Sequence, residues 1–189
     1  MTRRSKPRIW AMEGTWSSRI EDVRTVKPVL QALEHTGQVR TTHQSINRPE
    51  DIFDSFRRWG QNQHAGFTVG YLALHGTPGS VYVGRRKVGL VDLGEQLRAA
   101  GTKLPGRTLH LGSCAVLEDE DAVTTFRRAV GLKAITGFTE DVDWLESLAF
   151  ELLLLDVLTY YRRVDAVERY IENNHKEFAK RLGFTLLRN

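Results

Sequence analysis

Two stretches of the sequence each place a chemically reactive side chain after an apolar run. Residues 70–76 read Gly-Tyr-Leu-Ala-Leu-His-Gly and include His75, and residues 107–114 read Arg-Thr-Leu-His-Leu-Gly-Ser-Cys and end at Cys114, the single cysteine of the chain. A cysteine attacks as the thiolate, and a nearby imidazole can accept its proton. If the two runs are strands ending at the same edge of a sheet, His75 and Cys114 form a pair suited to nucleophilic catalysis.

Small residues accompany both candidate catalytic side chains. Gly76 permits close approach of the backbone to a substrate, and its amide together with that of Cys114 would hold a developing oxyanion. The alternative is that Cys114 is a buried small apolar residue and His75 a hydrogen-bonded loop residue, because free cysteine is among the most buried residue types. The occurrence of both residues at corresponding strand ends favours a paired site.

The elements that must position this pair alternate along the chain. Apolar runs predict strands at residues 7–13, 38–46, 70–76, 107–114 and 133–138, and a small antiparallel hairpin at residues 80–90. Helical spacing and end signals predict helices at residues 25–36, 49–59, 91–100, 143–162 and 164–182, and one that ends near Gly131. This order predicts an α/β domain with a mostly parallel central sheet and helices on both faces. Ligand sites in such sheets lie beyond the carboxyl ends of the strands.

Composition sets the class of protein. The 189 residues suit one domain, residues 1–189, with residues 1–6 as a flexible basic tail. The net charge of +4 is spread along the chain, which argues against a nucleic-acid partner. The apolar run from Leu145 to Leu158 contains acidic residues and is too short to span a bilayer, and the amino terminus lacks the apolar core of a signal peptide. We therefore expect a cytoplasmic protein without a membrane partner.

The blocks around the two candidate catalytic residues resemble a known family. Residues 71–76, 109–114 and 131–138 are similar to the His-Gly, Cys and following-strand blocks of the caspase-like (clan CD) cysteine peptidases, a group that includes caspases, metacaspases, separase and bacterial CHAT proteases. The resemblance covers roughly residues 7–160. It implies a three-layer caspase-like fold, His75 as the catalytic imidazole, Cys114 as the nucleophile, no cofactor or metal, and a peptide or protein substrate. Bacterial members of this kind often act in stress or defence systems.

The sequence departs from the caspase pattern in three respects. The separation of 39 residues between His75 and Cys114 is shorter than in caspases, and Leu-Gly-Ser precedes the cysteine in place of Gln-Ala. A long cleavable segment after the cysteine is absent. Maturation by chain cutting is therefore not expected, and regulation would need a protein partner or an effector.

The resemblance also indicates which residues would bind the substrate. In this clan the pocket for the residue before the scissile bond is lined by positions after the first strand, before the cysteine and after the fifth strand, which here include Glu13, Ser113, Asp141 and Asp143. Their carboxylates predict recognition of lysine or arginine. The alternative is that Asp143 caps the following helix and that Glu13 and Asp141 are solvated.

The remaining histidines fit less well as catalytic residues. His110 shares a strand face with Cys114 but lies about 13 Å from it along the strand, so we expect it to be a packing residue. The others lack metal-ligand spacing and are expected at the surface: His35, His43, His64 and His175.

Two other functions remain open. One is a catalytically inactive caspase-like module that binds a partner, because a fold alone does not establish chemistry. The other is an unrelated flavodoxin-like domain that binds a small ligand at the same strand edge. The sequence contains neither a phosphate-binding glycine motif nor a Gly-x-Ser-x-Gly elbow, which argues against nucleotide hydrolysis and serine hydrolase chemistry.

Overall fold

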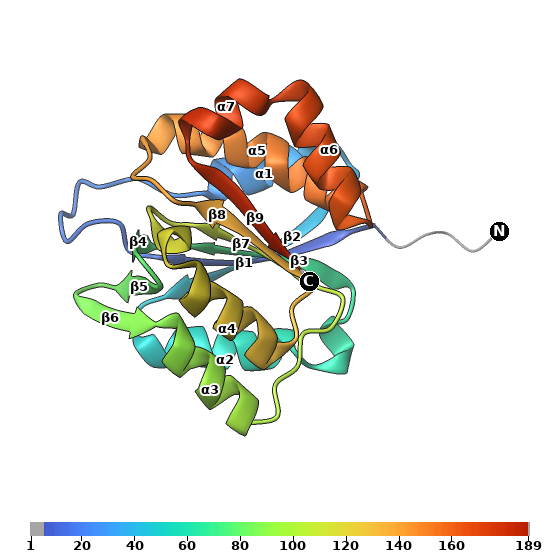
Figure 1. Ribbon diagram of the computed structural model, residues 1–189. Helices are drawn as coiled ribbons and strands as arrows, with labels where there is room; N and C mark the ends of the chain where they lie inside the picture. Colours follow the sequence, from blue (N-terminus) through green and yellow to red (C-terminus); the bar gives the residue numbers. More distant parts are fainter. Residues whose placement is uncertain (1–5, 189) are drawn as a thin grey trace.

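A computed structural model describes residues 6–188 as an α/β domain around a six-stranded sheet (Figure 1). The strand order is β2-β1-β3-β7-β8-β9. The first five of these strands run parallel and β9 is antiparallel to β8, which confirms the predicted, mostly parallel sheet. Their bounds are β1 Arg8–Gly14, β2 Arg40–Ile46, β3 Phe67–Ala73, β7 Thr108–Gly112, β8 Ala134–Phe138 and β9 Phe184–Arg188. Most of the predicted basic tail, residues 1–5, lies outside the described residues.

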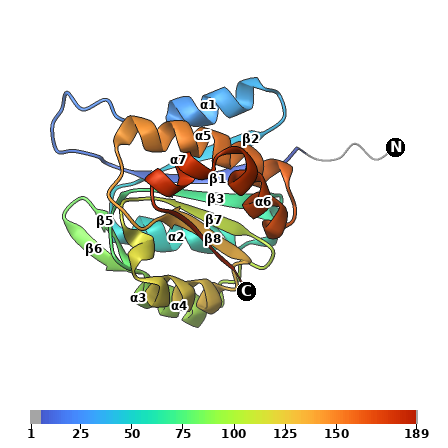
Figure 2. The ribbon, with the colours of Figure 1, turned by 45° about the horizontal axis from the view of Figure 1, so that its top comes forward.

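Helices cover both faces of the sheet, as predicted. On one face lie α1 (Lys27–His35), α5 (Trp144–Tyr160), α6 (Val164–Asn174) and α7 (Lys176–Arg181). On the other lie α2 (Pro49–Trp59), α3 (Leu90–Ala99) and α4 (Glu120–Val130), as Figure 2 also shows. Two short 3₁₀ helices, η1 (Asn62–His64) and η2 (Val116–Glu118), complete the helical elements of the described chain. The result is a three-layer arrangement.

The central strand β3 shows why this sheet needs two helical layers. Tyr71 packs in the apolar cluster beneath α1 and α5, whereas Leu72 packs in the opposite cluster beneath α2, α3 and α4. Alternate side chains of a strand point to opposite faces, so an apolar run buries both. The strand therefore lies in the interior, and its carboxyl end opens at the sheet edge that holds His75.

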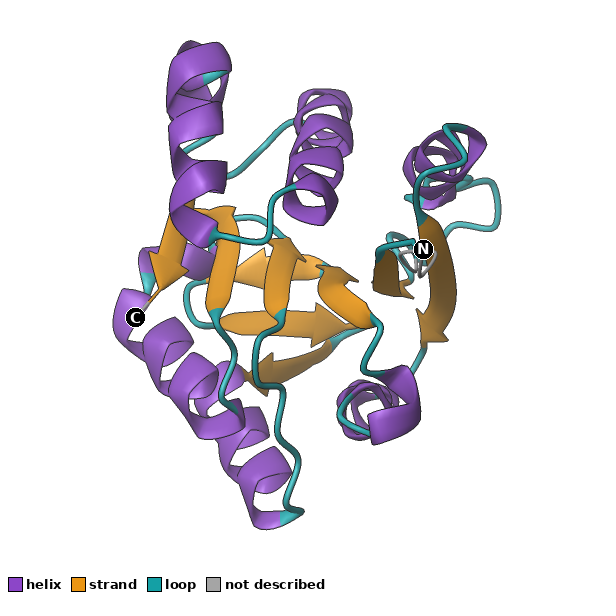
Figure 3. Ribbon diagram, turned by 90° about the vertical axis from the view of Figure 1, so that its right-hand side faces the viewer, coloured by secondary structure: helices purple, strands orange, loops and turns teal. Residues whose placement is uncertain are grey.

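A second, smaller sheet follows β3. It consists of β4 (His75–Thr77), β5 (Ser80–Val83) and β6 (Arg86–Gly89), all antiparallel. Figure 3 shows the strands of both sheets. The hairpin between β5 and β6 confirms the prediction for residues 80–90. The additional strand begins at His75 itself, so the candidate imidazole stands at the junction between the two sheets.

The end of the chain differs from the prediction. The single helix predicted over residues 164–182 is wrong, because the helix breaks at His175 between α6 and α7. The strand β9 that follows was not predicted. Gly183 has a φ of +60° and ends α7, after which residues 184–188 pair with β8. The partner strand, which is distant in the sequence, therefore determines the conformation of this segment.

No helix among residues 6–188 is long and apolar enough to cross a membrane.

Candidate active site

The connections between strands place the two candidate catalytic residues beside a break in the sheet topology. The chain passes from β1 outward to β2 and then returns across β1 to β3, so the strand order reverses between β1 and β3. In open α/β sheets the ligand crevice lies outside the carboxyl ends of the strands at such a point. The residues that follow β1 and β3, including Trp16 and His75, lie at this point of the sheet.

The imidazole of His75 is exposed, and one of its ring nitrogens is held by the loop that follows β1. Its Nε2 lies 2.7 Å from the backbone carbonyl oxygen of Trp16. A carbonyl oxygen can only accept, so this contact assigns the proton of a neutral His75 to Nε2 and leaves Nδ1 as the acceptor nitrogen. The indole ring of Trp16 also packs edge-to-face on the imidazole, with 5.3 Å between ring centroids. Both contacts restrict the orientation of the ring.

The residue after His75 packs directly against Cys114. A Cβ atom built on Gly76 would overlap the carbonyl oxygen of Cys114 and would lie 2.9 Å from Cβ of Ser113. Glycine is thus required for the close approach of β4 to the turn after β7. The structure therefore brings Gly76 against the backbone of Cys114, with His75 one residue earlier in β4, at the carboxyl ends of two adjacent strands.

Cys114 is partly buried at the start of a constrained turn. Its Sγ lies 4.0 Å from the carbonyl oxygen of Val142, in the loop before α5. The next residue, Ala115, has a left-handed backbone with φ of 51°, and its amide donates to the carbonyl oxygen of Glu140 at 3.0 Å. Such a conformation costs a non-glycine residue on the order of 1–2 kcal/mol. Backbone strain of this kind is frequent at functional sites.

Glu13 is buried inside a network of donors. Its carboxylate accepts hydrogen bonds from Trp16 Nε1 at 2.7 Å, Thr25 Oγ1 at 2.7 Å and Val26 N at 2.8 Å, and it contacts His43 Nε2 at 2.6 Å. The expectation that His43 lies at the surface is wrong, because this contact half-buries it. The alternative that Glu13 is solvated is also wrong, since only 6% of it is exposed.

The network determines both the charge and the role of Glu13. Burial opposes ionisation, but the hydrogen bonds from His43, Trp16, Thr25 and Val26 outweigh it and lower the pKa of Glu13 below its ordinary value. The carboxylate is therefore ionised and its lone pairs are already used. Glu13 holds the loop of residues 15–26 in place, and both of its carboxylate oxygens already accept hydrogen bonds within the protein.

The other residues predicted to bind the substrate occupy different environments. Asp143 caps α5, where its Oδ1 accepts from the amides of Leu145 and Glu146 at 2.9 and 3.0 Å. This confirms the capping alternative. Asp141 is exposed on the same loop. Ser113 is 3% exposed, and its hydroxyl has no hydrogen-bond partner among the described residues.

A buried polar network beneath the cysteine strand was not predicted. Tyr71 donates to Glu151 Oε2 at 2.5 Å, and His110 Nε2 contacts Glu151 Oε1 at 3.1 Å. The other ring nitrogen of His110 lies 3.0 Å from the hydroxyl of Thr136. Burial and the adjacent negative charge of Glu151 raise the pKa of Tyr71 well above its ordinary value. The signal in the sequence was Glu151 itself, because an acidic residue within an apolar helix needs buried partners.

This network extends to the base of the candidate site. A Cβ atom on Gly112 would lie 2.5 Å from Glu151 Oε1, so the carboxylate packs against the strand two residues before Cys114. His110 is fully buried, which confirms its assignment as a packing residue. The network links α5 to three neighbouring strands and fixes the end of β7.

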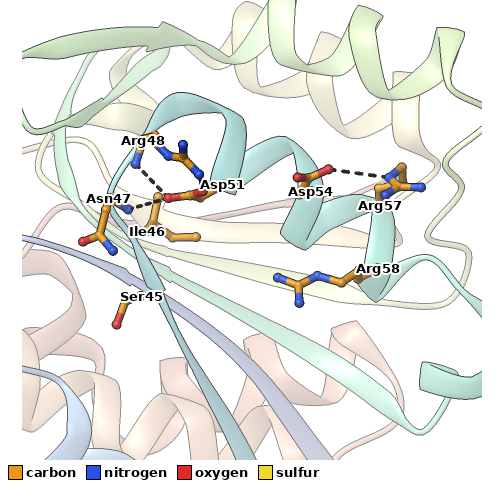
Figure 4. Close-up of a pocket in the computed structure, with 8 residues that line it drawn as sticks. All are labelled: Ser45, Ile46, Asn47, Arg48, Asp51, Asp54, Arg57 and Arg58. Carbon is orange, nitrogen blue, oxygen red and sulfur yellow. Dashed lines mark hydrogen bonds and ion pairs between the residues drawn. The ribbon is translucent and has the colours of Figure 1, made fainter.

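A separate hollow of about 570 Å³ lies over the end of β2 and α2 (Figure 4). Its charged side chains pair with one another, Arg48 with Asp51 at 3.5 Å and Arg57 with Asp54 at 3.7 Å. Arg58 donates to Gln44 at 2.8 Å. None of the predicted catalytic or binding residues lines this hollow. Its paired, exposed charges are typical of a solvated face.

Residues 6–188 contain no group of three or more histidine, cysteine, aspartate or glutamate side chains placed to hold a metal ion.

A comparison with known protein families gives a match over most of the chain. The chain belongs to DUF6642, a family of unknown function whose model matches residues 6–188. No curated protein matches the sequence. The family match covers the sheet, both helical layers and the candidate site.

Proposed function

We propose that the protein is a cysteine endopeptidase of the caspase-like clan that uses His75 and Cys114. The observation that carries the proposal is the contact of Gly76 with the backbone of Cys114, next to an imidazole oriented by the carbonyl of Trp16. This arrangement stands at the topological break of the sheet, where α/β proteins bind ligands. The strand order and the small sheet between the histidine and cysteine strands also support the resemblance.

The reaction follows from the orientation of His75. Its Nδ1 accepts the proton of the Cys114 thiol, and the sulfur then forms a bond with the carbonyl carbon of the peptide. The carbonyl electrons move to oxygen, where the amides of Gly76 and Cys114 donate hydrogen bonds. Collapse of this intermediate breaks the carbon–nitrogen bond, and the amine leaves with the proton from His75. Water, deprotonated by His75, then hydrolyses the thioester and restores the thiol.

The proposal includes cleavage after arginine or lysine. Asp141 supports it as an exposed carboxylate on the loop next to Cys114, and Ser113 supports it as a buried hydroxyl without a partner. Glu13 and Asp143 contribute indirectly, because one holds the loop after β1 and the other caps α5. The substrate is a peptide or protein segment, a regulatory protein partner controls access, and the reaction takes place in the cytoplasm.

A second candidate function is a catalytically inactive module of the same fold that binds a partner. The observation that favours it is the position of the thiol, whose hydrogen-bond contact among the described residues is the carbonyl of Val142 and not His75. In that case the chemistry of the pair is not required, and this end of the sheet serves only for binding.

Alkylation of the thiol separates the two candidates. We expect iodoacetamide to label Cys114 faster in the wild type than in His75→Ala at pH 6.5–7.5, because only the wild type has an imidazole to take the proton. The control is His35→Ala, which changes an exposed histidine on α1. Equal rates in the wild type and His75→Ala over the whole pH range would support the inactive module.

A further inference from the structure

The loop of residues 15–26 holds a guanidinium group beside the candidate catalytic histidine. Arg24 forms a two-pronged ion pair with Asp22, in which Nε lies 3.0 Å from Oδ1 and Nη2 lies 2.7 Å from Oδ2. Its Nη2 also lies 3.5 Å from the carbonyl oxygen of Trp16. That carbonyl is the one that accepts from His75 Nε2. The guanidinium and the imidazole therefore share an acceptor.

An aromatic wall forms the other side of this position. The guanidinium carbon of Arg24 lies 5.8 Å from the ring centroid of Trp144, at the start of α5. Trp16 packs edge-to-face on Trp144 with 4.5 Å between centroids. A cation within about 6 Å of an indole face is attracted by the ring quadrupole. We call the combination of the Asp22 carboxylate, the Trp16 carbonyl and the Trp144 ring the guanidinium seat.

The guanidinium seat is formed by two separate parts of the chain. Its three parts come from the loop after β1 and from α5, two elements that are distant in the sequence. The hydrogen bonds that Asp22 accepts from the side chain and the backbone amide of Arg24 lower its pKa to about 2. Asp22 is therefore ionised at neutral pH. A carboxylate, a carbonyl acceptor and an aromatic face together match a planar cation.

Resting on the proposed peptidase function, we infer that the guanidinium seat receives the basic side chain of the substrate and that Arg24 is its internal occupant. A substrate arginine has the same shape and charge as the Arg24 side chain, and the seat adjoins His75. While Arg24 occupies the seat, an external ligand cannot bind there. Its apparent affinity is therefore reduced in proportion to the fraction of protein molecules in which the seat is free. Displacement of Arg24 by a substrate or a partner would then open the site.

Agmatine, a guanidinium compound without a carboxylate, tests the seat by direct binding. The experiment uses Cys114→Ala as the parent and follows tryptophan fluorescence, because Trp16 and Trp144 line the seat. We expect Arg24→Ala and Arg24→Gln each to tighten agmatine binding by about tenfold, since both remove the occupant. Adding Asp22→Asn to either variant should cancel this gain. Arg19→Ala, a change in another exposed arginine of the same loop, should bind agmatine as the parent does.

The outcomes distinguish the seat from the peptidase activity. Agmatine affinity that is the same in the parent, Arg24→Ala and Arg24→Gln would overturn the inference. So would a gain in affinity that survives Asp22→Asn. These measurements need no active thiol, so they stand even if the protein does not cleave peptides. Conversely, cleavage by the wild type without preference between arginine and norleucine would contradict the seat and the preference for basic residues, but would leave the His75 and Cys114 chemistry intact.

Discussion

The backbone carbonyl of Trp16 lies 2.7 Å from Nε2 of His75, and the indole of the same residue packs on the imidazole ring. The loop after β1 thus sets the orientation of a side chain that follows β3. Trp16 and Thr25 of the same loop donate hydrogen bonds to Glu13. The buried carboxylate therefore helps to hold the loop that orients His75.

Gly76 should tolerate no side chain. In Gly76→Ala the new methyl group would meet the carbonyl oxygen of Cys114, so β4 and the turn after β7 must separate. We expect a loss of about 1–3 kcal/mol in the free energy of unfolding, as for other overpacked sites. Urea denaturation measures it. The matched control is Gly66→Ala, whose Cβ would find no atom closer than 3.6 Å, and an equally small effect in both variants would contradict the contact.

Glu13 should make stability depend on pH in the acid range. Its folded-state pKa is lowered, so it contributes stability that is present above its unfolded pKa and is lost as the pH falls through its folded pKa. We expect the wild type to lose stability between about pH 5 and the lower folded value, and Glu13→Gln to show a shallower dependence. Chemical denaturation from pH 3 to pH 7 measures this. Parallel curves for the two proteins would contradict the network.

The hydroxyl group of Tyr71 should contribute to the stability of the fold, in addition to the packing of its ring. Tyr71→Phe removes the donor to the buried carboxylate of Glu151 and should cost about 1.5–3 kcal/mol of unfolding free energy, as expected for a hydrogen bond to a charged group. Tyr82→Phe, at a partly exposed position, is the control and should cost little. If both variants unfold at the same urea concentration, the hydrogen bond to Glu151 contributes nothing.

The same tyrosine should affect stability at alkaline pH. Its pKa is raised in the folded protein, so the unfolded state loses this proton first and stability falls as the pH rises above about 10. Tyr71→Phe should remove that part of the decline. The measurement is unfolding free energy from pH 8 to pH 11.

The order of elements could be predicted because each has a local signal. Pro49 opens α2 and Gly131 ends α4 with a φ of +72°, and apolar alternation marks the strands of His75 and Cys114. The position of their strands, side by side and ending at one edge of the sheet, followed from the rule for parallel strands. Local patterns and topology were sufficient for this part of the site.

The rest depends on contacts between distant residues. Residues 184–188 pair with β8 only because α6 and α7 return the chain to the sheet, and no period in the sequence marks the break at His175. The contact between Glu13 and His43, which are 30 residues apart, likewise could not be predicted from the spacing of residues. The same holds for the position of Arg24 over Trp144. Tertiary packing determines which side chains of different elements meet. These contacts leave no local pattern in a single sequence.

Cleavage of fluorogenic peptides tests whether His75 and Cys114 form a peptidase site. The wild type, Cys114→Ala and His75→Ala are incubated with matched peptides that carry arginine, lysine or norleucine before the scissile bond. We expect cleavage of the arginine and lysine peptides by the wild type, loss of cleavage in both variants, and little cleavage of the norleucine peptide. Cleavage that persists in Cys114→Ala would contradict the proposed peptidase site. The site would also be contradicted if the wild type cleaves none of the peptides and its thiol is alkylated no faster than that of His75→Ala.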